Sequence, residues 1–341
     1  MPDTTPHAGC AIVTPSPSDS GTATHSDPVT HSEWYQSLDK DMKSAIRDLH
    51  QLRLLWNLTP ILFVLLWVGA AWLVMNVPHW SVWIAGYIFM GVVLHGIGNF
   101  MHEGIHGNLF RNRRWDRWYG FLCGAPVLFP VTAYGVNHLL HHKYTRSKQD
   151  PDEMLNITPS RWLLSAFFYF WFVFGSLVYS FRVAYIAMIR GTREERLHVS
   201  TERLLITFAA VGLLWAAYWY GFMDVMIHCW IIPLLVAACL GNVRGWAEHQ
   251  LTEGDHPLRQ TRTVTSHPVY SFLNIHLNYH LEHHLFPGVP WYNLPKVHRL
   301  LQPEYEKTGA SVYRSYFWFI WDACRIGVHG KTPDFARQPS P

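Results

Sequence analysis

The sequence has 341 residues, of which 49% are hydrophobic and only 15% are charged, and it contains 17 tryptophans. These proportions indicate a membrane protein with a sizeable polar part and exclude an ordinary soluble domain. The net charge of +3 is too small to indicate a nucleic-acid-binding protein, and the five scattered cysteines, without a C-x-x-C pair, indicate neither a disulfide framework nor a cysteine metal site.

The first 53 residues are expected to precede the membrane-spanning part. Residues 1–32 are rich in Ser, Thr, Pro and His and are predicted to be disordered; they lack the basic and apolar regions of a cleaved signal. A helix over 33–53 is predicted from apolar residues at spacings of four, four and three: Leu38, Met42, Ile46 and Leu49. Trp34 and Tyr35 favour a helix on the membrane surface, and an amphipathic helix packed on cytosolic protein fits equally well.

Two uncharged stretches predict a first pair of membrane spans. Residues 54–75 are long enough to cross the hydrocarbon core, a turn follows around Pro78, and residues 81–101 return the chain and end directly before His102. By the positive-inside rule, the flanking basic residues place both outer ends of this pair in the cytoplasm: Lys40, Lys43, Arg47, Arg53, Arg111, Arg113, Arg114 and Arg117.

The remaining apolar segments are less regular. Residues 119–131 are too short to span, so we expect them to dip into the membrane and bring the chain back. Residues 162–189 are long enough to span, whereas 204–222 and 225–240 are separated by two residues and form a hairpin of spans. Residues 241–341 are expected to form a polar cytoplasmic part.

Three histidine clusters dominate the polar segments. Residues 138–142 and 280–284 both read H-x-x-H-H, and residues 102–106 place two further histidines four positions apart. Residues three and four apart share a helix face, so each stretch is expected to direct its imidazoles to one spot. Eight such nitrogen ligands indicate bound transition metal, and more than one ion: His102, His106, His138, His141, His142, His280, His283 and His284.

These clusters constrain the topology. If residues 162–189 crossed the bilayer, three crossings would separate His142 from His280, and the clusters would face opposite sides. We therefore predict that 162–189 is re-entrant or lies in the interface. The expected fold is an all-α, four-span helical bundle with re-entrant or interfacial helices and a cytoplasmic histidine-rich cap.

An alternative function follows from His102-Glu103-x-x-His106, which also fits the zinc-protease pattern H-E-x-x-H. In that pattern the glutamate acts as general base and zinc activates water. A membrane zinc protease needs one further ligand, and it would leave both H-x-x-H-H clusters unexplained.

The three clusters resemble the histidine boxes of the membrane fatty acid desaturase and hydroxylase superfamily. The similarity runs over residues 54–301 and includes short motifs beside the boxes: Gly107-Asn108, Lys143-Tyr144-Thr145, Asp150-Pro151-Asp152, Asn278-Tyr279 and Phe286-Pro287. The resemblance implies a membrane di-iron domain over 54–301, followed by a C-terminal cytoplasmic segment over 302–341. It also implies two non-haem irons and oxygen-dependent attack on an unactivated C–H bond.

By this resemblance the eight box histidines are expected to bind the two irons, with His249 as a ninth ligand. His276 is its rival, because it lies one helical turn before the third box, and His298 is a weaker one. His95 is expected to be a packed polar residue. Nearby carboxylates should orient the ligand rings, and the candidates are Glu103, Asp150, Asp152, Glu153 and Glu282. For Glu282 a position facing away from its box is equally expected.

The expected substrate is an apolar acyl chain or a similar lipid-like molecule, and oxygen is the co-substrate. The sequence shows no fused electron carrier, so an external ferredoxin-type or cytochrome-type donor is implied; membrane lipids are expected partners and nucleic acid is not. Several reactions stay open: desaturation, hydroxylation, ketolation of a carotenoid, and oxidation of a small metabolite. A non-catalytic metal or haem carrier also stays open. We expect a multi-pass protein of a bacterial inner membrane with its active site on the cytoplasmic face.

Overall fold

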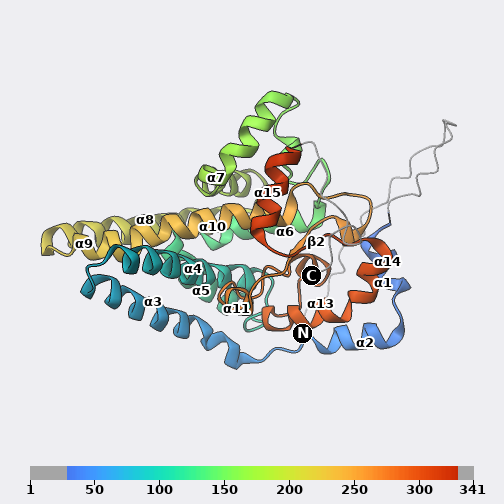
Figure 1. Cartoon of the computed structure of the whole chain (residues 1–341), viewed down its shortest axis with the longest axis horizontal. Helices are drawn as coiled ribbons and strands as arrows, with labels where there is room; N and C mark the ends of the chain where they lie inside the picture. The colour runs from blue at the N-terminus through green and yellow to red at the C-terminus, as the bar shows by residue number, and fades with distance from the viewer. Residues whose placement is uncertain (1–28, 329–341) are drawn as a thin grey trace, which may run out of the picture.

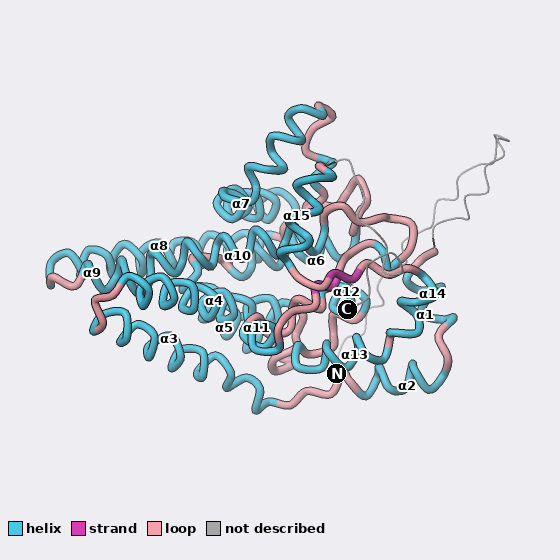
Figure 2. The backbone as a smooth tube through the Cα atoms, in the orientation of Figure 1, coloured by secondary structure: helices cyan, strands magenta, loops and turns pink. Residues whose placement is uncertain are grey.

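The computed structural model describes residues 29–328, and most of these are helical (Figures 1 and 2). Long helices form a bundle on the left of Figure 1, and short helices and loops form a cap on the right. Among the described residues, five helices are long and apolar enough to cross a membrane. The protein is therefore an all-helical integral membrane protein. The predicted disordered segment falls almost entirely on residues outside the described range.

The described part of the chain begins with two short helices, α1 (His31–Ser37) and α2 (Lys40–Asp48), where the sequence predicted one helix over 33–53. The break arises because the Asp39 side chain accepts a hydrogen bond from the backbone N–H of Met42 at 2.8 Å and caps a new helix. Trp34 and Ile46 are buried against the cap, so the apolar face of this segment covers protein.

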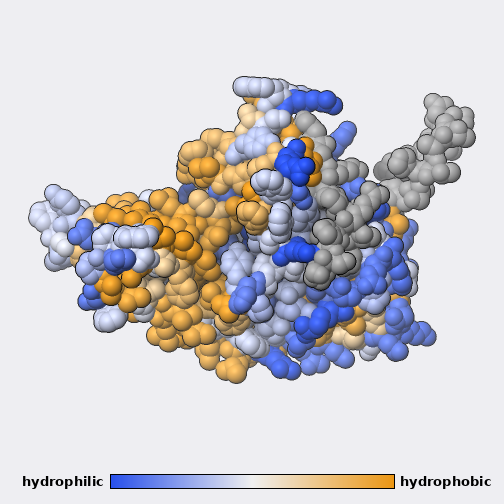
Figure 3. All heavy atoms as spheres, viewed as in Figure 1, coloured by the Kyte–Doolittle hydropathy of each residue, from blue (hydrophilic) through white to orange (hydrophobic). Residues whose placement is uncertain are grey.

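The bundle is built from α3 (Thr59–Asn76), α4 (Trp80–Ile105), α8 (Arg193–Tyr220) and α10 (Ile232–His249). A 3₁₀ turn, η1 (Leu54–Leu58), leads into α3, while α9 (Met223–Met226) and a π-helical turn (Ile227–Ile231) lead into α10. Figure 3 shows an apolar surface over these helices and a polar surface over the cap. The spans predicted at 54–75, 81–101, 204–222 and 225–240 fall within these four helical stretches.

Helix α4 lies between α3 and α10, and small residues allow the close approach. A Cβ atom on Gly91 would lie 2.5 Å from a methyl group of Val236 on α10. A Cβ atom on Gly96 would lie 2.0 Å from the carbonyl oxygen of Leu273 in the cap. Larger side chains at these positions would push α4, which carries the first histidine box, away from its neighbours.

The segment predicted to dip into the membrane forms two helices, α5 (Arg113–Gly124) and α6 (Val131–Tyr144), joined by a 3₁₀ turn (Ala125–Val127). They meet at an angle of 104°. Leu128 adopts a left-handed conformation with φ of 59° at this corner. The bend returns the chain toward the cap, so that α6 carries the second histidine box next to the end of α4.

Helix α7 (Arg161–Arg190) follows a 3₁₀ turn (Met154–Asn156) and is continuous for 30 residues. In Figure 1 it rises away from the layer formed by α8 and α10. It packs mainly against α6 and α10, and Ser176 donates a hydrogen bond to the Ala238 carbonyl of α10. Tyr169 donates a hydrogen bond to the Cys324 carbonyl, and Arg190 donates one to the Gln149 carbonyl.

Between residues 257 and 328, the part of the cap that the structure describes after α10, there are seven short helices and one two-stranded parallel sheet. The helices are η5 (Pro257–Arg259), α11 (Pro268–Leu273), α12 (His280–Leu285), η6 (Trp291–Asn293), α13 (Leu294–Leu300), α14 (Gln302–Thr308) and α15 (Tyr316–Ile326). Strand β1 (Thr263–Val264) pairs with β2 (Val312–Tyr313), with Thr263 opposite Val312. A buried apolar cluster that includes Phe100, Leu281 and Trp291 joins α4 to α12, and it seats the third histidine box over the end of α4.

Candidate metal centre

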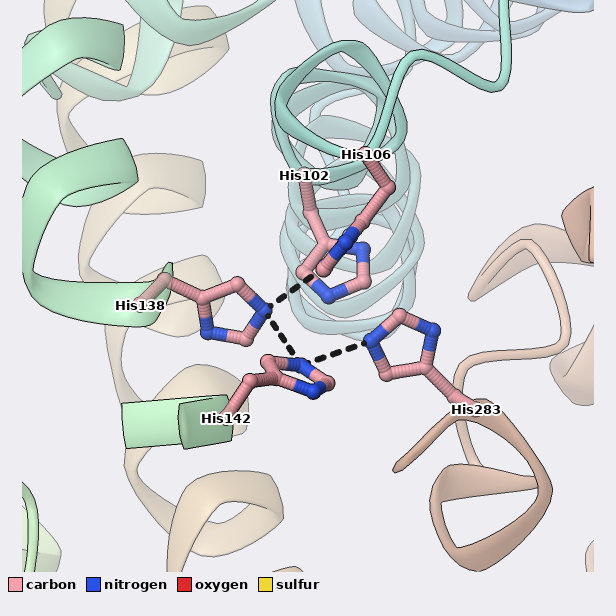
Figure 4. A group of neighbouring side chains, drawn as sticks. All are labelled: His102, His106, His138, His142 and His283. Atoms are coloured by element: carbon pink, nitrogen blue, oxygen red, sulfur yellow. Dashed lines mark hydrogen bonds between the residues drawn. The ribbon is translucent and has the colours of Figure 1, made fainter. Parts of the chain in front are cut away.

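Five histidines from three helices converge on one point (Figure 4). They are His102 and His106 at the end of α4, His138 and His142 on α6, and His283 on α12, and one ligand atom of each lies within 4.8 Å of the others. Nε2 of His138 lies 3.0 Å from Nε2 of both His106 and His142. Nε2 of His283 lies 3.1 Å from that of His142. We call these five residues the first group.

Four further histidines form a second group beside the first. His141, His249 and His284 have ligand atoms within 4.8 Å of one another, and so do His249, His280 and the carboxylate of Glu248. Nε2 of His280 lies 2.8 Å from Nε2 of His249. The two groups touch, because the rings of His142 and His284 stack with centroids 4.0 Å apart.

The donor sets fit bound transition metal ions. Nitrogens on adjacent corners of an octahedron with bonds of ~2.1 Å lie about 3.0 Å apart, which matches the measured separations. Both ring nitrogens of His102, Nε2 of His141 and Nε2 of His284 are buried without a hydrogen-bond partner in the described chain. Buried polar atoms are seldom left unpaired, so these nitrogens are suited to coordinate a cation.

The sequence predicted that each box directs its imidazoles to one spot. This prediction was wrong for the second and third boxes. His138 and His142 belong to the first group and His141 to the second, while His283 belongs to the first group and its neighbour His284 to the second. The reason is helical geometry. Adjacent residues lie about 100° apart around a helix, so the last two histidines of an H-x-x-H-H box point to different sites.

Two carboxylates hold outer nitrogens of these rings. Asp150 Oδ1 lies 2.8 Å from Nδ1 of His141, as the sequence predicted for this residue. Glu248 Oε2 lies 3.2 Å from Nδ1 of His280, and the same carboxylate pairs with Arg244 at 3.0 Å. The sequence analysis did not predict a role for Glu248. The signal that could have identified it is its position one helical turn after Arg244 and directly before His249.

The other predicted carboxylates have different partners. Glu103 is 3.6 Å from Nδ1 of His102, too far for a hydrogen bond, and its other oxygen accepts from the Trp291 backbone at 3.0 Å. Asp152 accepts from Asn137 and Tyr179, and Glu153 pairs with Arg146 at 2.5 Å.

Glu282 points away from the histidine groups, as the sequence allowed. It is fully buried and accepts hydrogen bonds from Thr263, Tyr305 and His298. Burial alone would raise the pKa of this carboxyl group, but His298 and the hydroxyl donors outweigh burial and hold the pKa below its ordinary value. Glu282 therefore anchors α12 to α13 and α14 rather than orienting a metal ligand directly.

The rival histidines lie outside both groups. Nδ1 of His276 lies 2.9 Å from the Ser271 hydroxyl, its ring stacks on Trp291 with centroids 5.6 Å apart, and burial lowers its pKa to about 4. His298 lies against Glu282. His95 contacts Arg244 at 3.4 Å, deeper in the bundle, and it packs there as the sequence predicted.

Comparison with known proteins identifies the family of this chain. Residues 78–316 match the fatty acid desaturase family, which is more than half of the chain. The chain belongs to the fatty acid desaturase family.

Relatives within this family act on different substrates. The chain is 28% identical to the human sphingolipid delta(4)-desaturase/C4-monooxygenase, over 79% of this chain and 80% of that protein. It is 27% identical to the dihydrorhizobitoxine desaturase of Bradyrhizobium elkanii, over 68% of this chain and 72% of the relative. It is 25% identical to the sn-1 oleoyl-lipid 12-desaturase of Arthrospira platensis, over 74% and 77%. The protein is thus an oxidoreductase with a lipid-modifying activity of the desaturase class.

A cavity of about 250 Å³ lies in this desaturase among α4, α6, α7 and α10, and box histidines form part of its wall. Apolar side chains such as Phe129, Trp171 and Leu234 line one part of it. Tyr134 also lines it, and its ring stacks on His138 with centroids 5.1 Å apart. The cavity therefore borders both groups, through His102 and His138 of the first and His141, His249 and His280 of the second.

Arg262 holds the end of α10, where Glu248 and His249 lie. Its guanidinium is fully buried and donates to the backbone carbonyls of Ala247, Gln250 and Leu251. These carbonyls close the last turn of the helix, where a cation is favourable because of the helix dipole. Tyr313 and Phe319 lie against the guanidinium at 5.3 and 4.8 Å. Arg262 was not among the residues predicted from the sequence.

Proposed function

We propose that the protein is an oxygen-dependent membrane desaturase that introduces a double bond into a fatty acyl chain or a similar lipid-like substrate. The observation that carries this proposal is the division of nine histidines into two adjoining groups beside a cavity, in a chain of the desaturase family. Two adjoining nitrogen-rich sites suit a pair of iron ions.

Each residue of the site has a proposed role. The first group would hold one iron and the second group, which includes His249, the other; bound there, iron activates oxygen toward C–H bonds. Asp150 fixes the orientation of His141 by accepting from its outer nitrogen, and the Glu248 carboxylate lies 3.2 Å from the outer nitrogen of His280. The apolar part of the cavity wall would hold the substrate chain beside both histidine groups.

The overall reaction requires an external reductant. A substrate CH₂–CH₂ unit loses two hydrogens, each with its electron, and becomes CH=CH. One O₂ takes up these two hydrogens together with two additional electrons and two protons, and leaves as two waters. The two additional electrons come from a ferredoxin-type or cytochrome-type protein. Hydroxylation of the same C–H bond is the alternative outcome, and one relative carries both activities in its name.

We further propose a four-span topology with the site at the cytoplasmic face. Helices α3, α4, α8 and α10 would span, and α7 would lie in the interface. Support comes from α7 itself, because Phe168 packs on Trp246, one turn before His249, and Arg190 contacts Gln149 in the loop that follows the second box. Both parts of α7 therefore contact the metal side of the molecule, which a crossing helix would not do.

A membrane zinc protease is disfavoured by the same geometry. Such a site combines two histidines with one further ligand and a water. Here His102 and His106 share one point with three other histidines, and Glu103, the would-be base, is fully buried and accepts from the Trp291 backbone.

The decisive experiment is purification with iron analysis, followed by lipid and metabolite profiling of cells that express the protein with a reductase system. We expect about two irons per chain and a new unsaturated product that requires oxygen. One zinc per chain without an oxidised product would contradict the proposal and favour a hydrolase. Loosely held, exchangeable metal without turnover would favour a carrier.

A further inference from the structure

One arginine joins two of the chain segments that carry the second group of histidines. His141 lies on α6, whereas His249 is the last residue of α10, and their rings meet with centroids 4.5 Å apart. Arg146 lies just after the end of α6, and its side chain is largely buried, with 14% of it exposed. Its backbone and its guanidinium contact different segments.

The backbone of Arg146 holds the loop that follows the second box. Its N–H group donates to Oδ2 of Asp150 at 2.9 Å, and Oδ1 of the same carboxylate lies 2.8 Å from Nδ1 of His141. Arg146 adopts a left-handed backbone conformation with φ of 64°. This conformation is costly for an arginine and is adopted readily by glycine, so contacts of the side chain must compensate for the strain.

The guanidinium of Arg146 holds the end of α10. It donates to the carbonyl oxygen of Thr252 at 3.0 Å and to that of His249 at 3.4 Å. The Thr252 hydroxyl donates to the same His249 carbonyl at 3.0 Å. Nη1 also pairs with Glu153 at 2.5 Å, and Glu153 is a buried residue of the loop that carries Asp150. The guanidinium therefore fastens the turn after His249 to the loop behind His141.

We propose that Arg146 is a positioning residue of the second group, which keeps His249 beside His141 so that both can bind one metal ion. This inference rests on the proposed metal-dependent function. The hydrogen bonds of Arg146 lead to two members of the second group, through Asp150 to His141 and directly to the backbone of His249. Loss of its side chain should therefore release the second metal and leave the first group occupied.

Metal retention by the purified full-length protein in lipid nanodiscs tests this role without turnover. The protein is loaded with isotopically enriched ferrous iron, dialysed against graded chelator, and measured by Mössbauer spectroscopy, which separates irons in different surroundings. Arg146→Gln should bind iron at the second group about 10- to 100-fold less tightly, the usual effect of losing a contact behind a metal ligand. The spectral component of the first group should persist. Arg146→Lys should fall between the glutamine variant and the wild type, because an ammonium keeps the charge but not the fork.

The matched control is Arg203→Gln. Arg203 is also partly buried and donates to a backbone carbonyl of another segment, that of Ser180 at 3.0 Å. It lies on α8, which carries none of the nine histidines of the two groups. This variant should retain iron like the wild type. Equal iron retention by Arg146→Gln and Arg203→Gln would overturn the proposal.

Two further substitutions separate the side chain of Arg146 from its strained backbone. Arg146→Ala removes the guanidinium and keeps the strain, whereas Arg146→Gly removes the guanidinium and relieves the strain. The glycine variant should unfold at a higher temperature than the alanine variant, and both should lose iron from the second group to the same extent. Wild-type iron retention by Arg146→Gly would overturn the proposal, because the backbone shape alone would then suffice.

A double variant separates positioning from simple neutralisation of charge. Loss of Arg146 leaves the buried carboxylate of Glu153 without this partner, which is destabilising by itself. Arg146→Gln combined with Glu153→Gln removes that charge, so the double variant should be more stable than Arg146→Gln and should still lose iron from the second group. Recovery of wild-type iron retention would overturn the proposal and show that Arg146 serves only to neutralise Glu153.

Failure of the proposed function has a different signature. Wild-type protein that retains zinc but no iron would refute the oxidase function. Cobalt(II) alone then serves as the probe, because its absorption spectrum reports nitrogen ligands, and unchanged cobalt affinity in Arg146→Gln would overturn the role of Arg146 as well. Loss of metal from both groups in Arg146→Gln would also overturn this inference, since it would indicate a general effect on the fold.

Discussion

Asp150 Oδ1 lies 2.8 Å from Nδ1 of His141, and both side chains are buried. The contact fixes the tautomer of His141. The carboxylate accepts a hydrogen bond from the N–H group at Nδ1, so Nε2 carries no proton and its lone pair is free. That nitrogen has no hydrogen-bond partner in the described structure and lies with the second group. The pair therefore links the loop after the second box to the proposed metal site.

Asp150→Asn should weaken metal binding at the second group by about 10- to 100-fold, the usual effect of losing a carboxylate behind a histidine ligand. The measurement is iron per chain after dialysis against graded chelator. Glu202→Gln is the matched control, because Glu202 is also buried and accepts from the Thr132 backbone, at 2.8 Å, but lies away from the histidines. Equal iron retention by the two variants would remove Asp150 from the site.

His249→Ala should lose iron and activity together, whereas His276→Ala should keep most of both. The reason is that the Nε2 atom of His249 lies 2.8 Å from that of His280, while His276 stacks on Trp291 outside both groups. Iron analysis and product formation in membranes check this. We expect His283→Ala and His141→Ala, one from each group, to abolish turnover while the protein still inserts. If His276→Ala proves the more damaging of the two, our ligand assignment is wrong.

His276 should also make stability fall at acidic pH. Burial lowers its pKa to about 4, so the folded protein keeps the ring neutral while the unfolded chain takes up a proton below its ordinary value of about 6.5. Stability is therefore unaffected above that pH and decreases as pH falls from there toward 4, by about 1.4 kcal/mol at pH 5.5.

His276→Gln removes this pH-dependent loss. In denaturant titrations in detergent micelles, the variant should be less stable than the wild type at pH 7.5, because it loses the stack on Trp291. The difference should shrink by about 1.4 kcal/mol at pH 5.5. If the difference in unfolding free energy between wild type and variant is the same at both pH values, His276 does not titrate as inferred.

Arg262→Ala should destabilise the cap by about 2–4 kcal/mol, since it leaves several buried carbonyls at the end of α10 without a donor. Arg262→Lys should rescue little, because a single ammonium cannot reach those carbonyls together and lacks the planar contact with Phe319. Thermal unfolding in detergent and chelator-resistant iron report the two effects. We expect both to fall, since the same turn carries His249. Full rescue by lysine would show that charge alone matters.

Helix α7 should not cross the bilayer. Single cysteines placed near residues 160 and 195 of a cysteine-free variant should both be labelled from the cytoplasmic side by a membrane-impermeant maleimide. The expectation follows from the contacts of Phe168 with Trp246 and of Arg190 with Gln149. Labelling of the two positions from opposite sides would rule out the interfacial placement and require an odd number of crossings between the boxes.

Much of the bundle was predictable because apolar length is a local property of the sequence. The stretches at 54–75 and 81–101 correspond to α3 and α4 within a few residues, and the dip over 119–131 corresponds to the bend between α5 and α6. The single helix predicted over 33–53 was wrong, since apolar spacing does not register that Asp39 starts a new helix.

The sequence predicted which histidines form the candidate site, but not which histidine belongs to which group. Spacing identified eight of the histidines that the structure brings together, and the family resemblance added His249. The direction of each ring depends on how α6 and α12 are turned toward each other. Glu248 and Arg262 escaped notice because a single carboxylate or arginine has no sequence signature. Their roles arise from contacts between segments that are distant in the chain, such as Arg262 with Phe319.

The first group has a consequence for how the protein is made. His142 and His283 meet although 141 positions separate them in the chain. A ribosome that has released the first two boxes into the membrane has not yet synthesised the residues that complete either group. Metal loading must therefore follow translation of the fourth long bundle helix and the cap, and the incomplete chain would carry five clustered imidazoles at α4 and α6 with nothing to enclose them. A nascent chain of this kind is a target for premature capture of the wrong metal, and we expect its maturation to depend on how fast the cap closes.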